Sequence, residues 1–220
     1  MATVVFDLDG TLANTSGDLL AAANWCFRDM GYGDVLNDAD AGTAVKGARA
    51  MLRLGLMRMG RPDDEAEIER QFPRLVSAYG DAIAVHTYLY PGAMEAVEAL
   101  KSAGHGVAIC TNKPEGLAHD LLNKLGVRDD FSALIGADTL PVRKPDPAPL
   151  REAVMRAGGD PSLCCLVGDT DTDRNTARAL GVPSVLVTFG PGEDDMAALQ
   201  PEALISHFDE LPPVVATLFG

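Results

Sequence analysis

The chain has 220 residues, of which 47% are hydrophobic and 23% charged, and its formal net charge at pH 7 is −14. This composition is typical of a globular protein with a sizeable core, and the acidic charge argues against nucleic acid and anionic membranes as partners. No apolar stretch approaches the roughly 20 residues of a membrane-spanning helix, no signal peptide is evident, and the four cysteines lack metal-ligand spacing, so we expect a cytoplasmic protein with reduced thiols.

The first predicted element is the apolar run at residues 4–6, which ends at two carboxylates, Asp7 and Asp9. This pattern predicts a strand that carries both acids at its carboxyl end, where Gly10 lets the chain turn away. In open α/β sheets, ligands bind at that end of the strands. Two buried aspartates so close together need a cation, a shared proton or both, so this segment is the first candidate for a functional site.

Residues 15–85 have helical periodicity and no strand pattern, which predicts an all-helical domain. We expect helices from Thr15 or Ser16 to about Met30, over 47–59 and over 63–84. Because strand patterns precede and follow this block, we interpret it as an insertion into the other domain.

From residue 86 onward, helix and strand patterns alternate. The expected strands lie at 106–111, 134–136, 163–168 and 184–188, and the expected helices at 92–103, 117–125, 147–157, 173–180 and 209–218. Strands that alternate with helices of this length indicate a parallel, doubly wound sheet with right-handed crossovers. We therefore predict an α/β protein in which residues 1–14 and 86–220 form a Rossmann-like core and residues 15–85 form the inserted helical domain.

Polar side chains recur at the ends of these strands or in the loops just beyond them. The segments are Asp7 with Asp9, Thr111-Asn112, Lys144, and the run from Gly168 to Asp173. Parallel strands bring their carboxyl ends to one edge of a sheet, so we expect these segments to converge. Carboxylates with open positions suit Mg²⁺, and a hydroxyl, an amide and an ammonium suit phosphate oxygens. The sequence therefore predicts a site for Mg²⁺ and a phosphate group.

The spacing Asp169-x-Asp171-x-Asp173 also resembles the first half of an EF-hand calcium loop. The sixth position of such a loop needs a glycine and holds Arg174, and the twelfth needs a glutamate and holds Leu180. A calcium-binding loop is therefore excluded.

The four segments resemble the motifs of the haloacid dehalogenase superfamily of phosphotransferases, and the likeness extends over nearly the whole chain. The matching residues are Asp7-Leu8-Asp9-Gly10-Thr11, Thr111-Asn112, Lys144 within Arg143-Lys144-Pro145-Asp146-Pro147, and Gly168-Asp169 followed by Asp173. The chain looks most like the phosphoglycolate phosphatase branch, with a helical cap inserted between the first and second motifs. Residues 15–85 are then the cap domain.

The resemblance implies that Asp7 is the catalytic nucleophile and Asp9 the general acid and base. Thr111 and Asn112 are expected to bind the phosphate group, and Lys144 to neutralise both the nucleophile and the phosphate. Chemistry of this kind hydrolyses a phosphomonoester through an aspartyl-phosphate intermediate, which splits one difficult displacement into two.

The same resemblance implies a Mg²⁺ cofactor held by Asp7, by Asp169 and by Asp9 through its backbone carbonyl. Asp173 is expected to lie outside the metal ligands and to interact with them. Mg²⁺ and Lys144 would offset the repulsion between a carboxylate nucleophile and an anionic phosphate.

The expected function is Mg²⁺-dependent hydrolysis of a small phosphorylated metabolite, with phosphoglycolate as the best candidate, by a monomer or homodimer. A sugar-phosphate phosphatase, a β-phosphoglucomutase-like phosphotransferase and a catalytically idle phosphate-binding module remain alternatives. The idle module predicts the loss of Asp7, Asp9, Lys144 or Asp169, and all four are present. Dehalogenases and phosphonoacetaldehyde hydrolases of this superfamily lack the second aspartate of the first motif, so the presence of Asp9 disfavours both.

For several basic residues the sequence is compatible with two roles. In the cap, Lys46 and Arg49 either belong to a solvated basic face or contact the leaving group of the substrate. Lys113 either contacts the substrate or is solvated. Arg143 is the weaker alternative to the adjacent lysine as the cation that binds phosphate.

Overall fold

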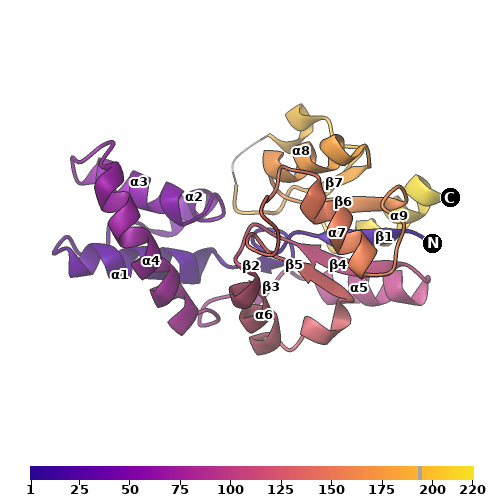
Figure 1. Cartoon of the computed structure of the whole chain (residues 1–220), viewed down its shortest axis with the longest axis horizontal. Coiled ribbons are helices and arrows are strands. Elements are labelled where there is room, and N and C mark those ends of the chain that lie inside the picture. The colour runs from indigo at the N-terminus through magenta and orange to yellow at the C-terminus, as the bar shows by residue number, and fades with distance from the viewer. Residues whose placement is uncertain (193–194) are drawn as a thin grey trace. The chain divides into compact units, whose positions relative to one another are not determined.

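The computed structural model describes residues 1–192 and 195–220, and its contacts divide the chain into two compact units (Figure 1). One unit contains Met1–Ala13 and Leu89–Gly190 together with the C-terminal residues from 195 onward, and the other contains Asn14–Tyr88. The sequence predicts domain boundaries after residue 14 and after residue 85, close to those of the two units.

Six parallel strands form the sheet of the first unit, in the order β5-β4-β1-β6-β7-β8. Their bounds are β1 Thr3–Phe6, β4 Gly106–Cys110, β5 Ala133–Ile135, β6 Cys164–Gly168, β7 Ser184–Val187 and β8 Ala203–Ile205. The chain adds β4 and β5 on one side of β1 and then β6, β7 and β8 on the other, so the strand order reverses beside β1. This doubly wound sheet confirms the predicted fold class, and its switch point, where such sheets bind ligands, lies at the carboxyl end of β1.

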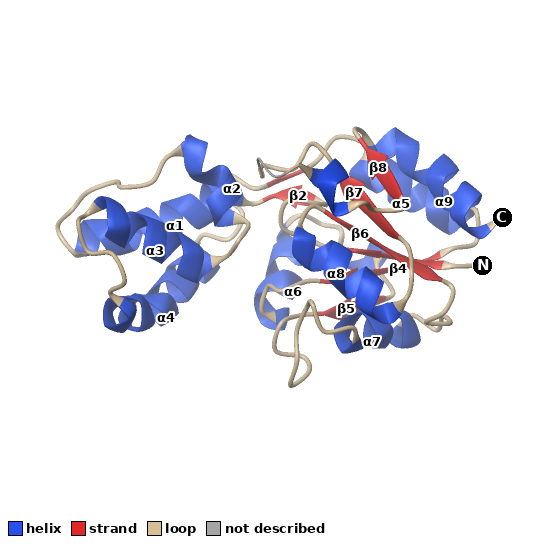
Figure 2. Ribbon diagram, turned by 90° about the horizontal axis from the view of Figure 1, so that it is seen from above, coloured by secondary structure: helices blue, strands red, loops and turns tan. Residues whose placement is uncertain are grey.

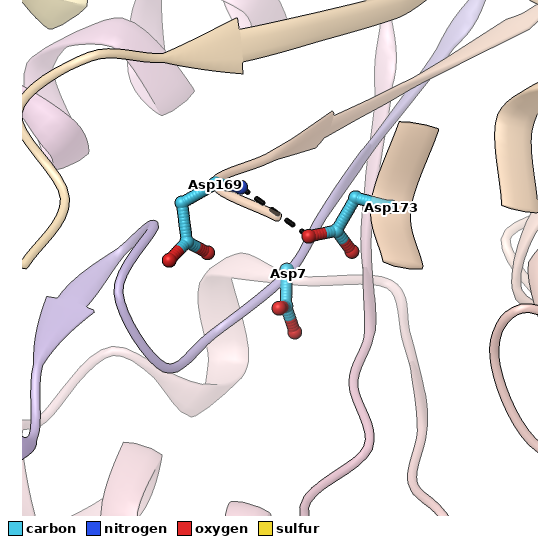
Figure 3. Close-up of side chains that lie close together, drawn as sticks. All are labelled: Asp7, Asp169 and Asp173. Atoms are coloured by element: carbon cyan, nitrogen blue, oxygen red, sulfur yellow. Dashed lines mark hydrogen bonds between the residues drawn. The ribbon is translucent and has the colours of Figure 1, made fainter. Parts of the chain in front are cut away.

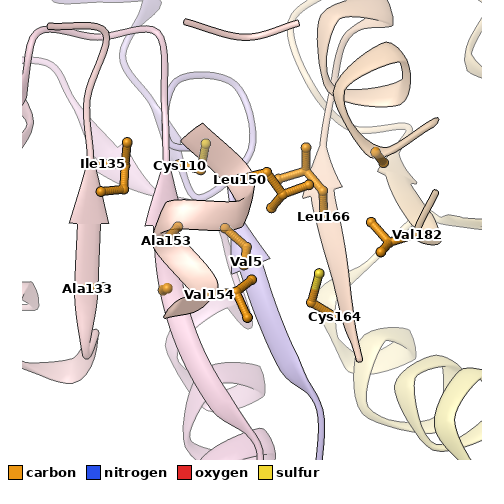
Figure 4. Close-up of a cluster of buried hydrophobic side chains, with 12 residues drawn as sticks. Val5, Cys110, Ala133, Ile135, Leu150, Ala153, Val154, Cys164, Leu166 and Val182 are labelled. Carbon is orange, nitrogen blue, oxygen red and sulfur yellow. The ribbon is translucent and has the colours of Figure 1, made fainter. Parts of the chain in front are cut away.

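The central strand β1 is buried along its whole length. Val5 lies in register between Ala108 of β4 and Leu166 of β6, in a buried cluster that includes Leu150 and Ala153 (Figure 4). A parallel strand covered on both faces has a continuous apolar run in place of an alternating pattern. This is why residues 4–6 are recognisable as a strand although they do not alternate.

Helices flank both faces of the sheet (Figure 2). Their bounds are α5 Ala93–Ser102, α6 Glu115–Lys124, α7 Ala148–Arg156, α8 Asp171–Leu180 and α9 Leu211–Phe219. All five correspond to helices expected from the sequence, whereas the three-residue strand β8 was not expected. Its segment is too short to give a period-two signal of its own.

The second unit is helical, with α1 Ser16–Asp29, α2 Ala41–Ala44, α3 Ala48–Arg58 and α4 Glu65–Asp81. The structure describes all of residues 15–85 and places no strand among them, as the sequence predicted. The two-residue strands β2 (Ala13–Asn14) and β3 (Tyr88–Leu89) pair with each other next to this block. The single-turn helix α2 was not predicted, because four residues carry no periodicity.

The start of α1 differs in detail from the expectation. Thr15 is the N-cap residue, but its side chain makes no capping hydrogen bond. Asn14 Oδ1 instead accepts from the Ser16 N–H over 3.2 Å. In the first turn, Asp18 accepts hydrogen bonds from the N–H groups of residues 85–87, where the chain leaves the helical unit.

The structure describes all four cysteines, and each is buried and outside any disulfide. Burial raises the pKa of the Cys110 thiol to about 12 and that of Cys26 to about 11, so these thiols are protonated and unreactive. None of the helices in the two described ranges combines the length and the apolar character that crossing a membrane requires.

Candidate active site

Backbone hydrogen bonds hold two of the predicted site residues at the edge of the sheet. The Asp7 N–H donates to Val167 O over 2.9 Å, and the Thr111 N–H donates to Ile135 O over 2.9 Å. Both bonds continue the parallel pairing one residue beyond β1 and β4. The sheet itself therefore fixes the backbone positions of Asp7 and Thr111.

Three carboxylates meet at this edge. Asp7 follows β1, Asp169 follows β6, and Asp173 lies in the first turn of α8 (Figure 3). One oxygen of each lies within 4.8 Å of the others, and all three side chains are buried. The convergence that the sequence predicts for these segments is therefore present.

Asp173 is occupied by protein donors. Its Oδ2 accepts from Thr170 Oγ1 over 2.7 Å and from the N–H groups of Asp169 and Thr170. Its Oδ1 accepts from Lys144 Nζ over 2.6 Å. Because both of its oxygens are engaged, Asp173 suits a role in orienting its neighbours better than a role as a direct metal ligand.

Asp7 and Asp169 each retain an oxygen that suits a cation. Among the residues that the structure describes, no donor hydrogen-bonds to Asp7 Oδ1 or Asp169 Oδ2, although both atoms are buried. Lys144 Nζ lies 3.0 Å from Asp7 Oδ1 as an ion pair, but the geometry is not that of a hydrogen bond. A donor set of carboxylate oxygens with no nitrogen or sulfur is the set that Mg²⁺ prefers. These residues therefore fit a divalent cation of this kind.

Burial also shapes the titration of the cluster. Burial raises the pKa of Asp7 to about 6, and the nearby Lys144 opposes this rise. Burial, followed by the charges of Asp173 and Asp7, raises the pKa of Asp169 well above its ordinary value. Buried carboxylates crowded together disfavour each other's ionised forms, and a bound cation would relieve that repulsion.

Lys144 is the cation of the third segment that reaches the cluster. It is 2% exposed and contacts both Asp7 and Asp173, whereas Arg143 is exposed. Asn112 Nδ2 donates to the Lys144 backbone carbonyl over 3.0 Å. The expected phosphate ligand Asn112 therefore also anchors the segment that carries the lysine.

Asp9 and Lys113 form a second ion pair in the site. Lys113 Nζ lies 2.8 Å from Asp9 Oδ1, and the Lys113 side chain is only 3% exposed. The interpretation of Lys113 as a solvated loop lysine is therefore wrong. Its position in the sequence, directly after Thr111-Asn112, was the available signal, but sequence alone does not distinguish an inward from an outward side chain.

Gly10 and Thr11 belong to the first motif, and the sequence predicts a turn at Gly10, but it gives neither residue a contact with Asp169. Thr11 Oγ1 donates to Asp169 Oδ1 over 2.7 Å and so orients that carboxylate. Gly10 has a φ of 86°, and a Cβ there would lie 2.2 Å from Asp169 Oδ2. The turn after β1 therefore needs glycine for both its conformation and its close approach to Asp169.

Of the two cap residues predicted to contact the substrate, Arg49 has partners within the helical unit. The Arg49 guanidinium makes two hydrogen bonds to Glu69, of 2.9 and 3.0 Å, and lies 3.8 Å from the centre of the Phe72 ring. These contacts join α3 to α4 and indicate a packing role for Arg49. Lys46 is exposed in the segment between α2 and α3. Substrate contact by Lys46 or Arg49 stays a prediction.

The fold and this arrangement of carboxylates and lysines define a class of protein. A model of the haloacid dehalogenase-like hydrolase family matches residues 1–181, and the chain belongs to that family.

Within this family, the chain is similar to several proteins named phosphoglycolate phosphatase. The chain is 38% identical to a phosphoglycolate phosphatase of Mesorhizobium japonicum over 94% of this chain and 92% of that protein. It is 36% identical to a phosphoglycolate phosphatase of Caulobacter vibrioides over 99% and 92% of the two chains. The crystal structure of a predicted phosphoglycolate phosphatase from Haemophilus somnus 129pt superposes with a TM-score of 0.84, at 26% identity, over 97% of each chain.

Proposed function

We propose that this protein is a Mg²⁺-dependent phosphatase that hydrolyses a small organic phosphomonoester through an aspartyl-phosphate on Asp7. The observation that carries the proposal is the buried Asp7 carboxylate beside Lys144 and Asp169, one oxygen of which accepts no hydrogen bond from the residues that the structure describes. Phosphoglycolate is the best candidate substrate, supported by two relatives of that name that align with more than nine-tenths of the chain.

In this proposal Asp7 and Asp169 hold Mg²⁺ through their side chains, and Asp9 holds it through its backbone carbonyl. When bound, the ion supplies positive charge that offsets repulsion between the nucleophile and the phosphate. Thr11 and Asp173 keep the surrounding groups in place through the contacts described above.

Asp7 attacks phosphorus, and the bond between phosphorus and the ester oxygen breaks. Asp9 gives a proton to the leaving alcohol and then accepts one from the water that hydrolyses the aspartyl-phosphate, which restores both carboxyls. Lys144 neutralises charge on Asp7 and on the phosphate. Thr111 Oγ1 accepts from the Lys113 N–H, which leaves its own hydrogen to donate to a phosphate oxygen. Asn112 assists in binding the phosphate.

Two experiments test the proposal, both by measuring the release of inorganic phosphate. In the first, Mg²⁺ is added to metal-free protein, and in the second, a panel of phosphorylated metabolites is assayed. We expect release that depends on Mg²⁺, with the highest kcat/KM for phosphoglycolate. Preference for a sugar phosphate supports the sugar-phosphate phosphatase, and formation of an isomeric phosphate without hydrolysis supports the β-phosphoglucomutase-like phosphotransferase. No turnover of any compound supports the idle phosphate-binding module.

We also propose a cytoplasmic location. The buried thiols, none of them in a disulfide, support a reducing compartment.

A further inference from the structure

Lys113 places a second buried ammonium in the site. Its side chain is 3% exposed, and its Nζ lies 2.8 Å from Asp9 Oδ1. An ammonium is unfavourable in a buried position unless an anion compensates it. The first buried ammonium, that of Lys144, already faces Asp7 and Asp173. The fold thus gives Asp9 a cation of its own.

The position of Asp9 in the reaction determines what Lys113 can reach. A carboxyl that gives its proton to the ester oxygen must approach it to about 2.6–3.2 Å. Because Lys113 hydrogen-bonds to the same carboxyl group, its Nζ lies within about 8 Å of that oxygen. An ammonium can donate three hydrogen bonds, so it can bridge Asp9 and a second anionic group on the leaving alcohol.

We propose that Lys113 is a specificity-determining residue that binds the carboxylate of a phosphorylated α-hydroxy acid. In such a substrate the carboxylate is attached to the carbon that carries the ester oxygen, so it lies next to Asp9 when the alcohol departs. This inference rests on the proposed function, since it uses the role of Asp9 at the leaving oxygen.

Charge supports the assignment. The chain carries a net charge of −14, so a substrate with two anionic ends needs local positive charge for each end. Among the residues that the structure describes, the buried cationic side chains are Lys113, Lys144 and Arg174. Arg174 pairs with Glu202 over 2.9 Å and donates to Leu199 O. Both partners precede the edge strand β8, whereas the carboxylate cluster lies at the ends of β1 and β6. Among the described residues, Lys113 is therefore the buried cation that lies beside Asp9.

A charge-matched substrate pair tests this inference. The values of kcat/KM are measured for phosphoglycolate and for its neutral carboxamide, with wild-type protein, Lys113→Met and Lys113→Gln. Lys113→Gln keeps an N–H donor near Asp9 without the charge, and it also serves if Lys113→Met fails to fold. Lys124→Met, at the exposed last turn of α6, the helix that follows Lys113 in the chain, is the matched control.

We expect both Lys113 variants to lower kcat/KM for phosphoglycolate about 10- to 100-fold more than for the carboxamide, and the control to change neither. Equal losses for the two substrates would show that Lys113 only positions Asp9, and unchanged values would remove it from the site. Either result overturns the inference while leaving the proposed function intact. A wild-type protein that hydrolyses neither compound rules out phosphoglycolate as the substrate and also overturns this inference, whereas failure on every compound of the metabolite panel overturns the proposed phosphatase activity itself.

Discussion

Lys144 and Asp173 form an ion pair with 2.6 Å between Nζ and Oδ1, and their side chains are 2% and 0% exposed. Burial opposes the charged lysine, but the carboxylates of Asp173 and Asp7 outweigh this effect and raise the pKa of Lys144. The lysine therefore stays charged in the folded protein. Removal of one partner of a buried pair leaves the charge of the other less compensated, so a substitution that breaks this pair should destabilise the protein.

Asp173→Ala should lower the free energy of unfolding by about 3–5 kcal/mol, because it removes the shorter ion pair of the buried Lys144 ammonium and the acceptor of the Asp169 and Thr170 N–H groups. Urea denaturation in the presence of chelator measures the change. The matched control is Glu152→Ala, which breaks the 2.8 Å pair with the half-exposed Arg156 on α7 and should cost about 0.5 kcal/mol or less. Similar losses in the two variants would contradict the buried role of Asp173.

Asp7→Asn should abolish turnover while the fold remains intact, because an amide is not a nucleophile towards phosphorus. We expect a loss of at least about three orders of magnitude in kcat, measured by phosphate release. Arg143→Ala, on the exposed neighbour of Lys144, should retain wild-type activity. If the Asp7 variant keeps a tenth of the wild-type rate, the nucleophile is another residue.

Asp7→Asn should also reveal how much the buried Asp7 carboxylate destabilises the metal-free fold. Burial raises the pKa of Asp7 from 3.8 to about 6. Between these values the unfolded chain has lost the proton while the folded protein still holds it, so rising pH disfavours the metal-free folded state. This penalty is absent below about pH 4 and complete above about pH 6, where it amounts to on the order of 3 kcal/mol.

Metal-free Asp7→Asn should therefore be more stable than metal-free wild type, by a difference that grows from about pH 4 to about pH 6 and then stays constant. Denaturant midpoints along this pH series measure it. Mg²⁺ added at pH 7 should stabilise wild type more than the variant, because ligand binding to the folded state alone shifts the equilibrium. A stability difference that does not change with pH would contradict the titration of Asp7.

Asp9→Asn should impair substrates with poor leaving groups most. Nitrophenolate departs without a proton, so phosphoryl transfer from nitrophenyl phosphate should be partly spared and the aspartyl-phosphate should accumulate. Rapid-quench measurement of the first turnover separates the two steps. An equal loss in the first step for phosphoglycolate and nitrophenyl phosphate would remove the general-acid role.

We expect Arg49 to contribute mainly to the stability of the cap and Lys46 to contribute to substrate recognition. Arg49→Ala loses the bonds to Glu69 and the contact with Phe72, so its main effect should be a lower melting temperature. Lys46→Ala should lower kcat/KM for phosphoglycolate about tenfold or more and leave nitrophenyl phosphate nearly unchanged. If Lys46→Ala affects both substrates alike, Lys46 does not recognise the leaving group.

Local patterns explain why much of the fold is predictable. The buried run at residues 4–6 ends at Asp7, so strand and acid are recognised together. Helices such as α7 and α8 show their apolar spacing within a few turns. The strand β8 has three residues and no such signal, and Lys113 and Arg143 look equivalent as loop cations, although one is buried and the other exposed.

By itself, the sequence determined the alternation of strands and helices and the acids at the end of β1, because both are set by neighbouring residues. Only the tertiary structure decided which polar atoms meet. It brought Lys113 onto Asp9, Thr11 onto Asp169 and Arg49 onto Glu69. Such partners lie far apart in the chain, and their pairing depends on which way each side chain points and on which buried charges must be compensated.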